Sequence, residues 1–182
     1  MKYKEVNNFF ENPDGIVEFS KTLTYYSYNT HPKPNSCGKY AGLRSREIHK
    51  EHRGFFDYLC HKIVHPHIVD LNKHPDTQWV FATYFSKINS KDKIIHPIHQ
   101  DASNLIKAGV IYLTKDIDPK SGTSLYNEDN KKIKEFKNKY NKMVMYDPTI
   151  PHSLNKFVDN RLVILFFLEQ LTYTYNQSII EL

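Results

Sequence analysis

The chain has 182 residues, of which 40% are hydrophobic and 14% aromatic, and its formal net charge is +5. This length fits one domain that buries roughly 70% of the surface of its unfolded chain, and the composition is that of a folded protein. No segment approaches the roughly 20 apolar residues of a membrane-spanning helix. Met1–Phe10 lacks the apolar core of a signal peptide. The only cysteines are Cys37 and Cys60, which excludes a disulfide framework.

The first part of the chain, residues 1–78, is predicted to be a helical and irregular support region. Asn12-Pro13-Asp14 has the residue types that favour the start of a helix. Residues 31–43 contain proline and glycine and predict a loop. Ser45–Val64 has apolar residues at helical spacing and predicts an amphipathic helix that is interrupted near Gly54.

The second part, residues 79–170, is predicted to be a β-rich core. Short segments of β-branched and aromatic residues, separated by turn residues, predict six strands: Trp79–Ile88, Ile94–His99, Ala108–Leu113, Thr123–Tyr126, Met143–Asp147 and Arg161–Leu168. We expect a mainly β fold, a sandwich or barrel with helices packed on one face. Helices do not alternate with these strands, which argues against a doubly wound α/β fold. The sequence shows no internal repeat, so residues 1–182 are treated as one domain.

A lysine-rich segment accounts for much of the positive charge. Six lysines lie between Lys131 and Lys142. Such a segment is most often a solvated loop or helix face, and contact with nucleic acid is the less common interpretation.

The motif that carries chemical information is His99-Gln100-Asp101. On an extended strand, residues two apart point to the same face, so the imidazole of His99 and the carboxylate of Asp101 would converge. His152 on a neighbouring strand would complete two nitrogens and one carboxylate on one side of a metal, a set that suits non-haem Fe(II) activating oxygen. Arg161 would then hold the carboxylate of an organic co-substrate.

Other histidines do not fit a metal site. His74-Pro75-Asp76 has the same spacing, but its proline predicts a turn. His61 and His65 are four residues apart without the glutamate of a metal-binding helix motif, and His49 and His52 have the wrong spacing. We expect His49, His52, His61 and His65 to be structural or at the surface.

Several segments match a known family in order and spacing: His99–Asp101, Gly109–Leu113, Ser121–Tyr126, Met145–Asp147 with Pro151–Ser153, and Arg161–Val163. Over Trp79–Leu168 they resemble the prolyl-hydroxylase-like Fe(II)- and 2-oxoglutarate-dependent dioxygenases, including small versions from phages and bacteria. Residues 1–75 match only loosely, around Tyr40–Ser45. The resemblance implies a double-stranded β-helix, the cupin-like jelly roll. The two cysteines and the missing signal peptide lead us to expect a protein that is not secreted and lies in the cytoplasm, or in that of a host cell if the protein is viral.

The resemblance also implies roles for individual residues. It implies that Fe(II) is bound by His99, Asp101 and His152. Arg161, nine residues after the second histidine ligand, would pair with the C5 carboxylate of 2-oxoglutarate. Tyr112 matches the tyrosine that hydrogen-bonds this carboxylate in prolyl hydroxylases, and Tyr84 is a second candidate. The family's Gly-Gly-Thr is Ser121-Gly122-Thr123 here, a departure that affects none of these ligands.

The implied reaction is hydroxylation of an unidentified peptidyl residue or small molecule with 2-oxoglutarate and O2, releasing succinate and CO2. Nucleic-acid demethylases of this superfamily typically carry a second arginine six residues after the first, and here that residue is Phe167. This departure argues against a nucleic-acid substrate. Two alternatives stay open: a non-catalytic jelly-roll binding or structural module, and a cupin-like metal enzyme that does not use 2-oxoglutarate. The sequence is silent on the substrate and on the oligomeric state.

Overall fold

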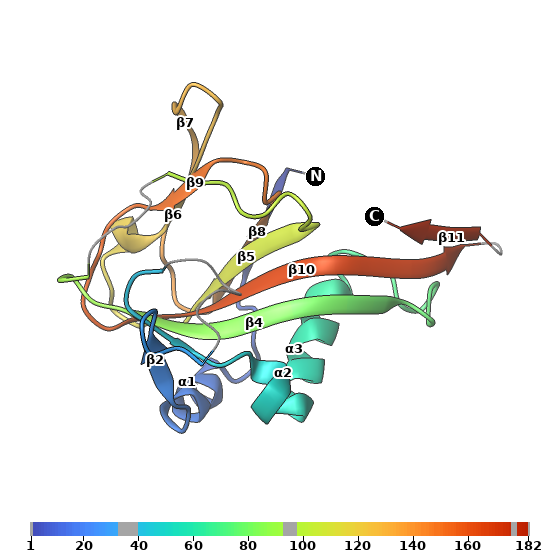
Figure 1. Cartoon of the computed structure of the whole chain (residues 1–182), viewed down its shortest axis with the longest axis horizontal. Helices are drawn as coiled ribbons and strands as arrows, with labels where there is room; N and C mark the ends of the chain where they lie inside the picture. Colours follow the sequence, from blue (N-terminus) through green and yellow to red (C-terminus); the bar gives the residue numbers. More distant parts are fainter. Residues whose placement is uncertain (1, 33–39, 93–97, 176–177, 182) are drawn as a thin grey trace.

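The computed structural model of the chain describes residues 2–32, 40–92, 98–175 and 178–181. In this part of the chain, two antiparallel β-sheets face each other and helices cover the outer face of the larger sheet (Figure 1). The helices are α1 (Pro13–Lys21), α2 (Ile48–Glu51) and α3 (Arg53–Val64), and a 3₁₀ turn spans Pro119–Ser121. None of the helices in the described part is long and apolar enough to cross a membrane.

The larger sheet has the strand order β1-β8-β5-β10-β4-β3-β2, with β11 paired to β10. Its strands are β1 (Tyr3–Asn7), β2 (Tyr25–Ser27), β3 (Leu43–Ser45), β4 (Gln78–Ile88), β5 (Lys107–Tyr112), β8 (Lys142–Tyr146), β10 (Arg161–Tyr175) and β11 (Ser178–Glu181). The smaller sheet has the order β7-β6-β9. Its strands are β6 (Thr123–Tyr126), β7 (Lys132–Phe136) and β9 (His152–Leu154).

Strand β10 runs through the middle of the larger sheet and divides the core in two. Its residues alternate between the two faces, because side chains along a strand point in opposite directions. Ile164 and Phe166 belong to the cluster beneath the helices, which includes Leu59 of α3. Val163 belongs to the cluster between the sheets, where Leu125 of the smaller sheet also packs. Apolar residues on both faces explain why this strand is recognisable from the sequence.

The predicted helices are present, but the one predicted over Ser45–Val64 begins at Ile48, because Ser45 belongs to β3. Asn12 caps α1 by accepting a hydrogen bond from the backbone N–H of Gly15 at 2.9 Å, and Pro13 begins the helix. The expected interruption near Gly54 is confirmed, because the break between α2 and α3 lies two residues before it, at His52, whose φ of −139° is not helical. Gly54 lies inside α3.

Two other expectations need correction. Residues 1–78 are not only helical and irregular, because β1, β2 and β3 lie within them and extend the larger sheet at both edges. The lysine-rich segment is not only a loop or helix face, because it contains strand β7 and ends in the buried Lys142 of β8. Glu5 of β1 supplies the compensating charge, with its carboxylate 2.9 Å from the Nζ atom of Lys134 and 3.3 Å from that of Lys142.

Five of the six predicted strands are confirmed within one or two residues at their starts, and β10 continues past Leu168 to Tyr175. The sixth, Ile94–His99, falls largely outside the described residues, as does Cys37. Cys60 is a buried free thiol in α3. His74-Pro75-Asp76 forms a turn before β4, as predicted.

Candidate metal centre

His99 and His152 are held opposite each other by their own backbones. The N–H of His99 donates to the carbonyl of His152 at 3.0 Å, and the N–H of His152 donates to the carbonyl of His99 at 2.8 Å. Residues that exchange both hydrogen bonds in an antiparallel bridge present their side chains on the same face. The two imidazole rings lie accordingly 4.4 Å apart between centroids. The expected pairing of His99 with a histidine on a neighbouring strand is therefore observed.

Asp101 reaches the same place without lying on a strand. The expectation of an extended strand through His99 and Asp101 is wrong for the described part, where only the single bridge at His99 is formed. Asp101 is positioned instead by a hydrogen bond from its N–H to the carbonyl of Pro148 at 3.0 Å, and the side-chain amide of Gln100 donates to the carbonyl of Thr149 at 2.7 Å. Both bonds attach the motif to the loop before β9.

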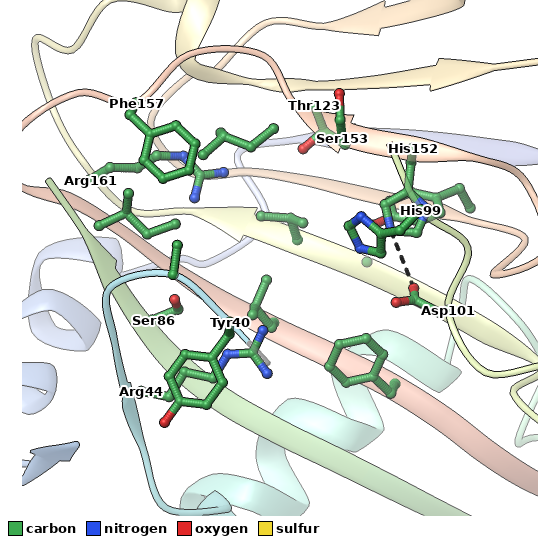
Figure 2. Close-up of a pocket in the computed structure, with 18 residues that line it drawn as sticks. Tyr40, Arg44, Ser86, His99, Asp101, Thr123, His152, Ser153, Phe157 and Arg161 are labelled. Atoms are coloured by element: carbon green, nitrogen blue, oxygen red, sulfur yellow. Dashed lines mark ion pairs between the residues drawn. The ribbon is translucent and has the colours of Figure 1, made fainter. Parts of the chain in front are cut away.

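Three potential ligand atoms converge at this point (Figure 2). One nitrogen from each of His99 and His152 and one carboxylate oxygen of Asp101 lie within 4.8 Å of one another. No other such group of three is found among the described residues, so His49, His52, His61 and His65 form no comparable site there. Two imidazoles and one carboxylate on one side of a metal, with open positions on the other side, is the donor set of non-haem Fe(II) oxygenases.

The hydrogen bonds of His152 prepare it to bind a metal. Its Nδ1 atom lies 2.9 Å from the carbonyl oxygen of Ile150, so Nδ1 carries the proton that it donates there. The Nε2 atom then has a free lone pair, and it lies 3.4 Å from Oδ2 of Asp101. Burial lowers the pKa of His152, which outweighs the opposite effect of the Ile150 hydrogen bond and favours the neutral imidazole that metals require.

Asp101 is the complementary half of this arrangement. Burial raises its pKa, and the positive charges of His99 and Arg44 oppose that shift. Its Oδ2 atom is buried and makes no hydrogen bond within the described part of the chain. A buried carboxylate oxygen that faces a nitrogen lone pair is unfavourable on its own and favourable when a cation lies between the two atoms. The residues present therefore fit a divalent metal.

The three ligands lie at one side of a pocket of about 190 Å³ between the two sheets. Its walls come mainly from β10, β9, β5 and β4, with single residues from β3, β6 and β8 and a contribution from the segment leading into β3. Most of the lining is apolar, including Ile88, Leu154, Phe157, Leu165 and Phe167. Among the described lining residues the charged ones are Arg44, Asp101 and Arg161.

Arg161 opens β10 and is only 3% exposed. Its Nε–H donates to the carbonyl of Ser121 at 3.0 Å, which fixes the guanidinium against the turn before β6. Burial lowers the pKa of Arg161, and the groups that oppose this shift are the phenols of Tyr112 and Tyr146 rather than any carboxylate of the described residues. A buried guanidinium without an internal carboxylate is costly unless an anion enters the pocket.

The two tyrosines proposed as co-substrate contacts have different surroundings. Tyr112 is fully buried and donates its hydroxyl proton to Oγ1 of Thr123 at 2.9 Å, and Thr123 lines the pocket. The guanidinium carbon of Arg161 lies 5.7 Å from the Tyr112 ring. Tyr84 packs edge-on against Phe167 at 6.5 Å between centroids. Neither tyrosine is itself among the described lining residues, but the ring of Tyr112 lies close to the guanidinium of Arg161.

Sequence reasoning did not assign several residues of the pocket, among them Tyr146 and Arg44. Tyr146 of β8 lines it, with its ring centroid 4.7 Å from that of His152. The alternation of Lys142, Val144 and Tyr146 along a strand beside β5 was the signal that places Tyr146 on the inner face. Arg44 comes from β3, which is too short to be recognised from its sequence.

No family model matches this sequence, and no curated protein matches it. Solved structures do share its fold. An oxidoreductase of the 2OG-Fe(II) oxygenase family from Burkholderia pseudomallei aligns with a TM-score of 0.65 and 10% identity, over 92% of this chain and 85% of that chain. A prolyl hydroxylase from Trichoplax adhaerens, in complex with a hypoxia-inducible-factor degradation-domain peptide, aligns with a TM-score of 0.59 and 12% identity, over 92% and 83% of the two chains. HygX from Streptomyces hygroscopicus, with nickel and 2-oxoglutarate bound, aligns with a TM-score of 0.56 and 9% identity, over 92% of this chain and 82% of that chain.

The protein therefore has the jelly-roll fold of the 2OG-Fe(II) oxygenases, as its sequence resemblance implied. At identities of 9 to 12% the likeness concerns the fold. What the site can do has to be argued from its own residues, namely the converging His99, Asp101 and His152 and the buried Arg161.

Proposed function

We propose that the protein is an Fe(II)- and 2-oxoglutarate-dependent dioxygenase that hydroxylates a peptidyl residue or a small molecule and releases succinate and CO2. The observation that carries this proposal is the presence of a two-histidine, one-carboxylate cluster and a buried arginine in one pocket. The cluster fits Fe(II), and Arg161 fits the far carboxylate of a dicarboxylic co-substrate.

Each residue has a defined task in this reaction. Bound Fe(II) and 2-oxoglutarate would supply the oxidising chemistry, as cofactors do in general. His99, Asp101 and His152 hold the metal, and the Ile150 carbonyl keeps His152 in the tautomer that binds through Nε2. Arg161, fixed by the Ser121 carbonyl, orients the co-substrate by charge pairing. The apolar walls between the sheets exclude water from the reacting atoms.

A cupin-like metal enzyme that does not use 2-oxoglutarate has no use for Arg161. Burying a guanidinium costs several kcal/mol unless it is paired, so its retention at 3% exposure supports a carboxylate ligand. A non-catalytic jelly-roll module needs neither the cluster of metal ligands nor the buried Arg161. Phe167 lines the pocket, where the nucleic-acid demethylases of the resemblance would carry an arginine, so a peptide or small molecule is the better fit.

The test is succinate formation from 2-oxoglutarate after addition of Fe(II) under air. The wild type is expected to form succinate in proportion to added Fe(II), and Asp101→Ala is expected to lose that activity. Asp76→Ala is the matched control, because Asp76 occupies the same position in the other His-x-Asp sequence and lies in an exposed turn. Succinate formation by Asp101→Ala at the wild-type rate would exclude the proposed site.

A further inference from the structure

Tyr146 lies at the end of the pocket that holds the metal ligands. It lines the pocket, and its ring centroid is 4.7 Å from that of His152. In the larger sheet, Tyr146 of β8 is opposite Ala108 of β5, which is opposite Phe167 of β10. Arg161 lies at the start of β10, well before Phe167 along the strand. Figure 2 shows Arg161 and the ligand cluster on opposite sides of the pocket, so Tyr146 and Arg161 belong to its two ends.

The hydroxyl of Tyr146 is a donor without an acceptor in the described part of the chain. Tyr146 is only 4% exposed, yet its hydroxyl makes no hydrogen bond to any described residue. Its oxygen is not fully enclosed either, so it opens onto the pocket that the residue lines. A phenol is protonated at neutral pH and can donate. A buried donor without an acceptor is unfavourable, and an acceptor that enters the pocket removes this cost.

Tyr112 differs from Tyr146 on each of these points. Its hydroxyl is already used, because it donates to Oγ1 of Thr123 at 2.9 Å. Tyr112 is not among the described lining residues of the pocket. It is opposite Val163, two residues from Arg161 along the chain, so it lies at the arginine end. The available phenol of the two is therefore the one beside the metal ligands.

We propose that the Tyr146 hydroxyl donates a hydrogen bond to the metal-binding end of 2-oxoglutarate, while Arg161 pairs with the far carboxylate. This inference rests on the proposed function, because it assumes that 2-oxoglutarate occupies the pocket. A 2-oxo acid that binds a metal through its keto group and one carboxylate oxygen keeps the second carboxylate oxygen as an acceptor. Tyr146 and Arg161 would then recognise the two ends of one molecule and select 2-oxo acids of this length.

The experiment is calorimetric titration of the full chain loaded with Mn(II), without Fe(II), with two acids. 2-Oxoglutarate has both ends, whereas 2-oxopentanoate has the same metal-binding end but lacks the far carboxylate, and its weaker binding is followed at millimolar concentrations. Tyr146→Phe is expected to weaken both acids by the same factor, roughly tenfold or more, because a hydrogen bond to a charged group is lost. Arg161→Met is expected to weaken only 2-oxoglutarate.

Urea unfolding of the metal-free protein separates a ligand contact from a structural role. Tyr146→Phe removes a hydroxyl without a partner, so its unfolding midpoint is expected to equal or exceed that of the wild type. Tyr112→Phe is the comparison and should lower the midpoint, because its hydrogen bond to Thr123 is lost. Tyr3→Phe is the control for binding. Tyr3 is opposite Tyr146 on β1, is 41% exposed and is not a described lining residue, so its loss should leave both affinities unchanged.

Two failures are distinguishable. If the wild type does not bind 2-oxoglutarate in the presence of Mn(II), the proposed function is wrong. If it does, the inference is overturned when Tyr146→Phe keeps the wild-type affinity for 2-oxoglutarate, or when it lowers the urea midpoint as Tyr112→Phe does. It is also overturned when Tyr146→Phe weakens 2-oxoglutarate but not 2-oxopentanoate, since the hydroxyl would then contact the far carboxylate.

Discussion

Oδ2 of Asp101 and Nε2 of His152 lie 3.4 Å apart, yet no hydrogen bond joins them. The imidazole proton is on Nδ1, which donates to the Ile150 carbonyl, so two electron-rich atoms face each other. This pair is therefore unfavourable without a metal and favourable with one. The arrangement lowers the stability of the metal-free protein and favours metal binding.

Asp101→Asn should make the metal-free protein equally stable or more stable, by up to about 1 kcal/mol. The asparagine amide is able to donate to Nε2 of His152, and the buried charge disappears. The same change should abolish the stabilisation by Mn(II), which for the wild type is about 2.7 kcal/mol at 100 times the dissociation constant. Denaturant unfolding with and without Mn(II) measures both effects. Asp76→Asn should change neither, and a destabilised, Mn(II)-responsive Asp101→Asn would contradict the interpretation.

Tyr112→Phe should weaken 2-oxoglutarate binding more than Tyr84→Phe does. Tyr112 is the tyrosine beside Arg161, and its hydroxyl is held by Thr123 at the pocket wall. Tyr112→Phe removes a buried hydrogen bond, so we also expect a loss of about 1 kcal/mol in stability. Titration of the Mn(II)-loaded variants with 2-oxoglutarate makes the comparison. A larger effect of Tyr84→Phe would assign the co-substrate contact to Tyr84 instead.

Gly122→Ala should destabilise the protein by more than about 2 kcal/mol, because a Cβ atom there would lie 1.8 Å from the carbonyl oxygen of Phe136. Gly122 follows Ser121, whose carbonyl positions Arg161, so the variant should also bind 2-oxoglutarate less tightly. Gly54→Ala is the matched control, since nothing lies within 4 Å of its Cβ position and α3 should gain helix propensity. If urea unfolding shows that Gly122→Ala is as stable as the wild type, the close approach of Phe136 in β7 to Gly122 is contradicted.

Glu5→Gln should lower stability at neutral pH by about 1 kcal/mol, a value reduced for the partial exposure of Glu5. Burial raises the pKa of Glu5, but hydrogen bonds from Lys134 and Lys142 outweigh it and lower the pKa below 4.5. A carboxyl whose folded pKa is lowered stabilises above its unfolded pKa, and this contribution is lost as the pH falls through the folded value. The difference between variant and wild type should therefore shrink below pH 4.5. An equal difference in stability between Glu5→Gln and the wild type at pH 7 and at pH 3 would show that the charge of Glu5 does not stabilise β1.

The sequence predicted the central strands well because they are apolar on both faces or end at clear turns, as β4, β5 and β10 do. It did not predict β1 or β3, whose short, half-exposed segments become strands only through pairing with β8 and β4. Strand β7 was hidden by its lysines, because Glu5, the partner of Lys134, lies more than a hundred residues away in the chain.

The same distinction holds for the site. His99, Asp101, His152 and Arg161 were found because short motifs carry them. Tyr146 and Arg44 lie in segments that resemble the family, but those segments do not mark them as pocket residues, and they reach the pocket because the larger sheet places β8 and β3 on its two sides. The residues that we propose to hold the cofactor are thus readable from the sequence, whereas these other lining residues depend on the tertiary structure.

The most direct test of the central claim is calorimetric titration of the Mn(II)-loaded protein with 2-oxoglutarate, beside the metal-free protein and Arg161→Met. We predict one binding site per chain that requires the metal, and a loss of roughly 30-fold or more in affinity in Arg161→Met, since truncating one partner of a buried charge pair costs about 2–5 kcal/mol. The affinity of Arg161→Lys for 2-oxoglutarate should lie between those of the wild type and Arg161→Met. Binding of equal strength in Arg161→Met, or in the absence of metal, would contradict the account.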